Sequence, residues 1–174
     1  MNGETKRDAA VPEQAQTPPD CFRLEELERF QSLESQTLDN INYYLWLHSA
    51  PSGRELNQGI LYFLELIFEH HDPLYLTCGE DSTAIQVSDE ATLLDTAARL
   101  QSLHGQPTIQ RIRANTSLLW QPLIGKTLTA IHLARHENGL YANNALKLDF
   151  GDSQIVVQLA QKEGLEIVKA NDEL

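Results

Sequence analysis

The sequence predicts an α+β protein with two tandem, diverged antiparallel β-meander units that share a core, a short N-terminal helix and one central linking helix. Three observations predict it: an internal repeat, apolar residues that alternate within each copy, and two stretches with helical spacing. Residues 30–41 align without gaps with residues 120–131, and five of the twelve positions are identical. Three further blocks recur in the same order in both copies: 64–68 with 146–150, 74–76 with 155–157, and 84–87 with 164–167.

The chain starts with residues 1–21, a polar, acidic segment that we expect to form a flexible leader. The first β-unit, residues 22–87, opens with a short helix that has Leu24, Leu27 and Phe30 on one face. Four short strands then follow, because apolar side chains alternate with the period of half-buried strands.

A linking helix is predicted within residues 88–107. Ser88 suits the N-cap position, and Asp89 and Glu90 would lie in the first turn, where the helix dipole favours anions. Gly105 suits a left-handed residue that ends the helix.

The second β-unit spans residues 108–170, and residues 171–174 form a tail. Its first segment, 108–114, is predicted to be a strand because it contains several β-branched residues. The four strands of the second copy follow it. We expect both units to pack into one compact domain.

The two copies differ on the strand face opposite their shared Leu/Phe pattern. In the first copy this face is apolar, so we expect the two helices to cover it. An alternative is that its aromatic residues form a binding patch, Tyr44 and Trp46 above all. The residues concerned are Tyr44, Trp46, Phe63, Ile67 and Tyr75 in the first copy, and His132, Ala134, Ala145, Asp149 and Val156 in the second.

Charge separates along the chain. The net charge is −12; residues 1–95 carry −13, residues 96–136 carry +5 and residues 137–174 carry −4. Such an acidic balance argues against nucleic-acid binding and favours a cationic protein partner. The simpler alternative is a charged surface that only keeps the protein in solution.

Compartment and membrane signals are few. The apolar stretches are far shorter than the roughly 20 residues of a membrane-spanning helix, and residues 1–20 contain no apolar region typical of a signal peptide. We therefore expect a cytoplasmic protein without membrane contact. Cys21 and Cys78 are expected to be free thiols there, although a bridge between them is an alternative.

Several patterns resemble catalytic or metal sites but lack required parts. Gly125-Lys126-Thr127 lacks the earlier glycine of a phosphate-binding loop, and His132 and His136 lie in a segment that is predicted to be a strand rather than a helix. The cluster His70-His71-Asp72 suits a polar turn. No nucleophile–base arrangement is recognisable. The sequence therefore predicts a protein that is not an enzyme and has no cofactor or metal.

The leading hypothesis is a non-enzymatic protein-binding module, an acidic immunity or inhibitor-type protein that neutralises a cationic partner such as a bacterial toxin. The alternatives are a self-associating adaptor or structural protein, which would form a homodimer, and a small-ligand-binding protein or enzyme with a pocket between the repeats. The candidate binding residues are Tyr44, Trp46, Glu65, Glu69, Asp72, Glu80 and Asp81.

Overall fold

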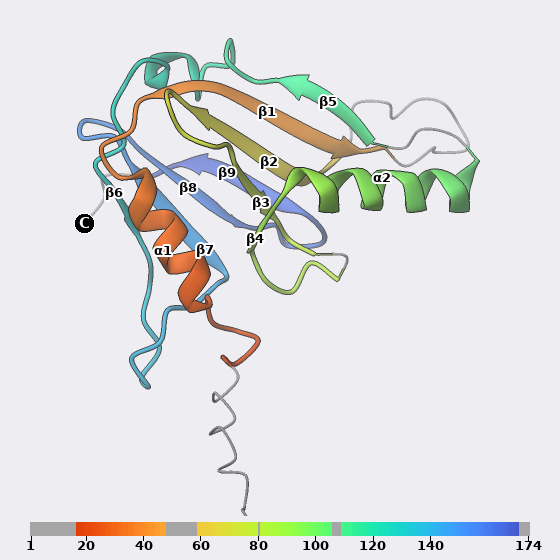
Figure 1. The fold of residues 1–174 in the computed structure, drawn as a ribbon, viewed down its shortest axis with the longest axis horizontal. Helices are drawn as coiled ribbons and strands as arrows, with labels where there is room; N and C mark the ends of the chain where they lie inside the picture. Colours follow the sequence, from red (N-terminus) through yellow and green to blue (C-terminus); the bar gives the residue numbers. More distant parts are fainter. Residues whose placement is uncertain (1–16, 48–58, 80, 106–108, 171–174) are drawn as a thin grey trace, which may run out of the picture.

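The computed structural model describes residues 17–47, 59–79, 81–105 and 109–170 (Figure 1). Within these ranges the chain forms two α-helices and two antiparallel sheets, so the predicted α+β class is confirmed. In chain order the elements are α1 (Leu24–Leu33), β1 (Leu38–Trp46), β2 (Ile60–Phe68), β3 (Leu74–Thr77), β4 (Gln86–Ser88), α2 (Glu90–His104), β5 (Ile109–Arg113), the 3₁₀ helix η1 (Gln121–Leu123), β6 (Ala130–His132), β7 (Ala145–Asp149), β8 (Gln154–Leu159) and β9 (Leu165–Lys169).

Each copy of the repeat builds one four-stranded meander. The first sheet has the order β4-β3-β2-β1-β5 and the second has the order β6-β7-β8-β9. The aligned sequence blocks fall on β2 and β7, on β3 and β8, and at β4 and β9. Strand β5, which belongs to neither meander, pairs with β1 and makes the first sheet one strand wider.

The two copies meet at equivalent positions. Thr37 and Thr127, which align in the repeat, form an antiparallel bridge with each other. The Ser35 N–H donates to the Leu128 carbonyl at 2.7 Å, and the equivalent Gly125 N–H donates to the Leu38 carbonyl at 2.8 Å. Such reciprocal bonds place a local pseudo-twofold axis at the bridge. Ser35 and Gly125 also share a left-handed backbone, with φ of 76° and 86°.

One hydrophobic cluster contains buried side chains from both sheets. Leu64 and Leu76 on the first sheet and Leu148 and Val157 on the second are fully buried. This shared core is why the two meanders depend on each other: a single sheet would leave one apolar face in water. Trp120 lies in the same cluster with no exposed surface, and its indole N–H donates to the Tyr43 hydroxyl at 2.5 Å.

Helix α2 begins one residue later than the sequence suggested. Its N-cap is Asp89, whose side chain accepts a hydrogen bond from the Thr92 N–H at 2.7 Å, and not Ser88. Ser88 instead ends β4, paired with Tyr75. The predicted end is confirmed, because Gly105 has a left-handed φ of 74°.

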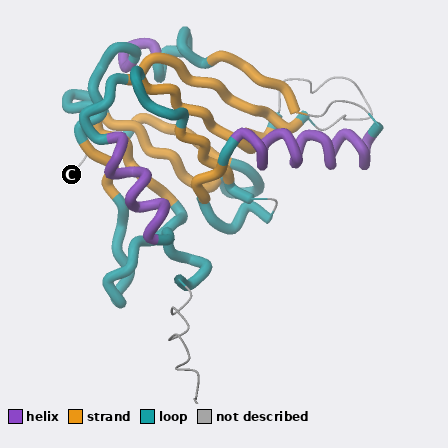
Figure 2. The backbone as a smooth tube through the Cα atoms, in the orientation of Figure 1, coloured by secondary structure: helices purple, strands orange, loops and turns teal. Residues whose placement is uncertain are grey.

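The two helices have different positions. Leu93 and Thr96 in the first half of α2 are buried, and Leu93 joins the core cluster with Phe63 and Tyr75. The second half of α2 extends beyond the strand ends (Figure 2). Helix α1 lies beside β4 and against β6 instead. Both helices contribute buried side chains to the core cluster, and the expectation that they cover the second face of the first copy stays a prediction.

No helix in the described parts of the chain is long and apolar enough to cross a membrane.

Candidate functional site: a groove between helix α1 and strand β6

The two aromatic candidates lie near the end of β1. Tyr44 and Trp46 are both half-buried and pack against the core cluster. Trp46 makes an edge-to-face contact with Tyr62, with ring centroids 6.4 Å apart. The register between β1 and β2 shifts between the pairs Tyr44–Phe63 and Leu45–Leu61, as at a β-bulge. These aromatic side chains thus contribute to packing, and their role as a binding patch stays a prediction.

Glu65 is buried, with 6% of its surface exposed, at the centre of a polar cluster on the first sheet. Its Oε1 accepts hydrogen bonds from Asn42 Nδ2 and the Tyr44 hydroxyl, both at 2.9 Å. Its Oε2 accepts one from the Tyr75 hydroxyl at 2.8 Å. A carboxylate enclosed by three donors cannot meet a partner at the surface, so Glu65 does not take the docking role expected from the sequence.

The cluster alters the acidity of its tyrosines. Burial, together with the hydrogen bond and the charge of Glu65, raises the pKa of Tyr44 to about 12. The same causes raise the pKa of Tyr75. Both hydroxyls are therefore held in the protonated form that donates to the carboxylate. This arrangement gives both carboxylate oxygens of the buried Glu65 hydrogen-bond donors.

The other predicted carboxylates lie apart from this cluster. Glu69 and Asp72 are exposed in the turn between β2 and β3. Asp81 is exposed and accepts a hydrogen bond from the Thr83 N–H at 3.3 Å. Glu80 lies outside the described residues. The structure therefore brings Tyr44 and Glu65 together, whereas, among the described residues, the exposed Glu69, Asp72 and Asp81 make no hydrogen bond to this pair.

A groove of about 340 Å³ runs between α1 and the segment that follows β6. Helix α1 contributes Leu27 and Phe30, and the opposite wall contains Ile131, Leu133 and Tyr141. Its lining is thus largely apolar. Two exposed carboxylates, Glu28 and Glu34, also line the groove, together with Leu24 and Gln31. The groove combines apolar walls with negative charge, a combination that suits an amphipathic cation.

Buried Glu26 fixes α1 to the edge of the first sheet. Its Oε1 accepts the Arg23 N–H at 2.9 Å, which caps the helix N-terminus. Its Oε2 accepts the Val87 N–H of β4 at 2.8 Å, as a neighbouring strand would. Because both oxygens are used, the helix and the strand edge are held in one orientation.

A second contact joins α1 to the first sheet, at the turn between β2 and β3. The Arg29 Nη2 donates to the carbonyls of Asp72 and Pro73, each at 2.7 Å. Burial lowers the pKa of this guanidinium, which remains charged because the ordinary value is far above neutrality. With Glu26 near one end and Arg29 near the middle, α1 presents a wall that exists before any ligand arrives.

Strand β6 is an edge strand next to this groove. Among the described strands it pairs with β7 alone, whereas its counterpart β1 pairs with β5 as well as with β2. The linking segment thus completes the first sheet, and nothing equivalent in the described parts of the chain completes the second. An edge strand presents backbone N–H and C=O groups that another chain can pair with.

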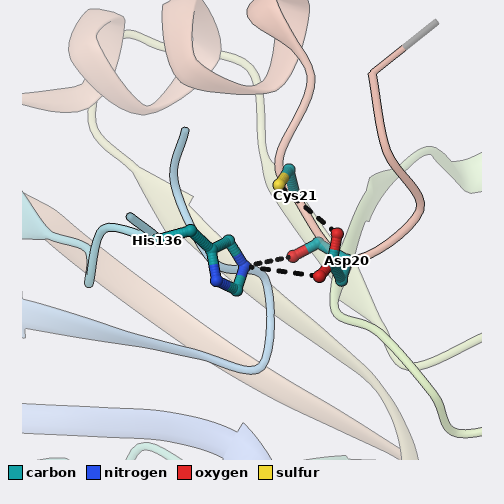
Figure 3. A group of neighbouring side chains, drawn as sticks. All are labelled: Asp20, Cys21 and His136. Atoms are coloured by element: carbon teal, nitrogen blue, oxygen red, sulfur yellow. Dashed lines mark hydrogen bonds and ion pairs between the residues drawn. The ribbon is translucent and has the colours of Figure 1, made fainter. Parts of the chain in front are cut away.

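A separate group of possible metal ligands joins Asp20, Cys21 and His136 (Figure 3). Their ligand atoms all lie within 4.8 Å of one another. Cys21 is buried, and its Sγ donates to Asp20 Oδ1 at 3.5 Å. Burial and the neighbouring Asp20 raise the pKa of this thiol. Cys21 and Cys78 are both free, so the alternative of a bridge between them is not realised.

Sequence reasoning missed both the groove and this ligand group. Each joins residues about a hundred positions apart, and no local spacing connects them. The sequence offered one signal for the groove: the apolar residues Leu24, Leu27 and Phe30 lie on one face of α1, and such a face usually packs against another element. Comparisons with known protein families, curated proteins and solved structures gave no match.

Proposed function

We propose that the chain is a non-enzymatic protein-binding module that takes an extended, cationic, amphipathic segment of a partner protein into the groove between α1 and β6. The observation that carries the proposal is the juxtaposition of apolar groove walls, the exposed carboxylates Glu28 and Glu34, and the edge of β6, which pairs with β7 alone among the described strands.

Each part of such a segment has a counterpart in the groove. Its backbone would add to the edge of β6, which is the usual mode of strand addition. Alternate apolar side chains would contact Leu27, Ile131 and Leu133. Lysine or arginine side chains between them would reach Glu28 and Glu34 at the rim.

The charge of the whole chain supports a basic partner. At −12 the protein attracts cations over long range and speeds their encounter. A basic toxin captured in this way would make the chain an immunity-type inhibitor. Charge repulsion would at the same time exclude nucleic acid from this surface.

Peptide binding tests the proposal. A peptide of alternating Lys and Val should bind and shift the backbone amide resonances of residues 130–133 and of α1, and a Glu/Val peptide should not. The double variant Glu28→Lys, Glu34→Lys should weaken binding about tenfold, because each reversed rim charge changes the free energy by about 0.5–1 kcal/mol.

A matched control separates the groove from general charge. Asp95→Lys with Glu166→Lys changes the net charge by the same amount at two exposed positions on α2 and β9. This control should weaken binding less than about threefold, the loss expected from long-range attraction alone. Equal losses in both double variants, or resonance shifts away from α1 and β6, would contradict the proposal.

Self-association is the second candidate function. Strand β5 is an edge strand of the first sheet among the described strands, and its exposed Arg111 and Arg113 have a positive charge that complements the negative charge of Glu28 and Glu34. An edge of one copy would then pair with the groove of the next. Light scattering across a range of salt and protein concentrations decides: a monomer throughout removes this candidate.

A further inference from the structure

We propose that Asp20, Cys21 and His136 form a Zn²⁺ site that ties the start of the described chain to the hairpin after β6. The inference does not rest on the proposed peptide groove. It starts from the close approach of three side chains with different ligand atoms: a carboxylate, a thiol and an imidazole.

These ligand types are the ones that zinc prefers. Zn²⁺ binds thiolate sulfur at about 2.3 Å and imidazole nitrogen or carboxylate oxygen at about 2.0 Å, usually with tetrahedral geometry. Tetrahedral angles and these bond lengths place sulfur and oxygen about 3.5 Å apart, and nitrogen and oxygen about 3.3 Å apart.

Two observed separations already approach these values. Cys21 Sγ lies 3.5 Å from Asp20 Oδ1, and His136 Nε2 lies 3.7 Å from Asp20 Oδ2. The two separations end on different oxygens of one carboxylate (Figure 3), so the Asp20 side chain would rotate for one oxygen to bind the same metal ion. His136 Nε2 also contacts the Asp20 carbonyl at 3.1 Å, so the ring already faces this residue.

The backbone holds the ligands from two sides of one strand-like segment. Cys21 forms an antiparallel bridge with Ala142, and the Phe22 N–H donates to the Tyr141 carbonyl at 2.9 Å. On the other side, the His136 N–H donates to the Leu140 carbonyl at 2.8 Å. Both ligand-bearing segments are thus fixed to residues 140–142 before any metal binds.

Binding has a simple chemical balance. Zn²⁺ replaces the proton of the Cys21 thiol, which passes to the buffer, and a zinc–sulfur bond forms without oxidation or reduction. The imidazole binds as the neutral ring through Nε2, and Asp20 binds as a carboxylate. Three protein ligands leave a fourth position for water. The metal would fix the hairpin that carries Tyr141, one wall of the groove.

Cobalt substitution provides the test. Metal-free full-length protein, kept reduced, is titrated with Co²⁺ and the bound metal is then displaced with Zn²⁺. We expect the intense thiolate-to-cobalt charge-transfer absorption together with the visible bands of four-coordinate Co²⁺, and we expect Zn²⁺ to remove both.

Variants assign the ligands. Cys21→Ser should abolish the charge-transfer band, whereas Cys78→Ser, at the other buried cysteine, should keep it. Asp20→Asn and His136→Ala should each lower Zn²⁺ affinity at least about 100-fold, since loss of an outer partner alone costs about 10–100-fold. Neither of these side chains is buried, so both variants should keep the wild-type circular dichroism spectrum.

Three results would overturn the inference: absence of a thiolate–cobalt band in the wild-type protein, persistence of the band in Cys21→Ser, or Zn²⁺ affinities of the Asp20 and His136 variants within about threefold of wild type. Peptide binding is measured separately, so failure of the zinc site leaves the proposed function standing, and the reverse also holds.

Discussion

Replacing Glu65 by leucine removes the acceptor from the buried polar cluster while it keeps a side chain of similar volume. Asn42 and Tyr75, with 3% and 8% of their surface exposed, would then have donors with no acceptor. Each buried donor left without a partner costs about 1–3 kcal/mol. Tyr44 is half-buried and its hydroxyl can bond to water instead, so the loss of its hydrogen bond to Glu65 costs less free energy. We expect Glu65→Leu to lower the free energy of unfolding by about 3–5 kcal/mol.

Glu65→Gln tests the same cluster more gently. One amide oxygen remains as an acceptor, but the amide nitrogen now meets a donor hydroxyl or the Asn42 amide. A loss of about 1–2 kcal/mol is expected, because one of the three bonds must be remade or given up.

Urea unfolding followed by circular dichroism measures these changes, and an unchanged dependence on urea concentration shows that stability itself has altered. Glu69→Leu, in the exposed turn, is the control and should stay within about 0.5 kcal/mol of wild type. If Glu65→Leu is as stable as this control, Glu65 does not hold the cluster together and the burial argument is wrong.

Two further predictions concern other parts of the molecule. The pKa of Tyr44 is about 12 in the folded state, above the unfolded value of about 10. The stability that the Tyr44 hydroxyl contributes is therefore complete below pH 10 and is lost as the pH rises through 12. Tyrosinate absorbance should show that Tyr44 ionises at high pH, and the ionisation should move to lower pH in Glu65→Gln. Gly164→Ala should lower stability by at least about 2 kcal/mol, because a Cβ there would lie 2.5 Å from Ile60 Cγ2 and 2.8 Å from the Leu61 carbonyl oxygen at φ +87°. Thermal unfolding measures this loss; Gly139→Ala, which has a similar φ of +86° and no atom within 4 Å, is the control for backbone strain and should lose less.

The repeat could be predicted because its evidence is local. The Thr-Leu step at Thr37 and Leu38 recurs at Thr127 and Leu128, and the structure places these residues at equivalent positions on the bridge between the copies. The alternation of apolar residues shows which face of each strand is buried, even when the element that packs against this face is unknown. The predicted N-cap of α2 was one residue too early, because Ser88 and Asp89 are both suitable N-cap residues by sequence. The pairing of Ser88 with Tyr75 in the sheet decides in favour of Asp89.

The candidate sites could not be predicted in the same way. Glu65 was expected at the surface because acidic side chains usually are exposed, but its three donors come from β1 and β3, on either side of β2. The groove needs α1 beside β6, and the zinc ligands need Cys21 beside the hairpin that carries His136. These contacts depend on how two sheets and a helix pack, which no spacing within the chain encodes.

The amino-acid sequence by itself determined the duplicated strand skeleton, the α+β class and the acidic charge, because each follows from short-range periodicity or composition. Only the tertiary structure decided that β5 joins the first sheet and that β6 pairs, among the described strands, with β7 alone, because sheet edges acquire their partners by complementary packing across the whole molecule.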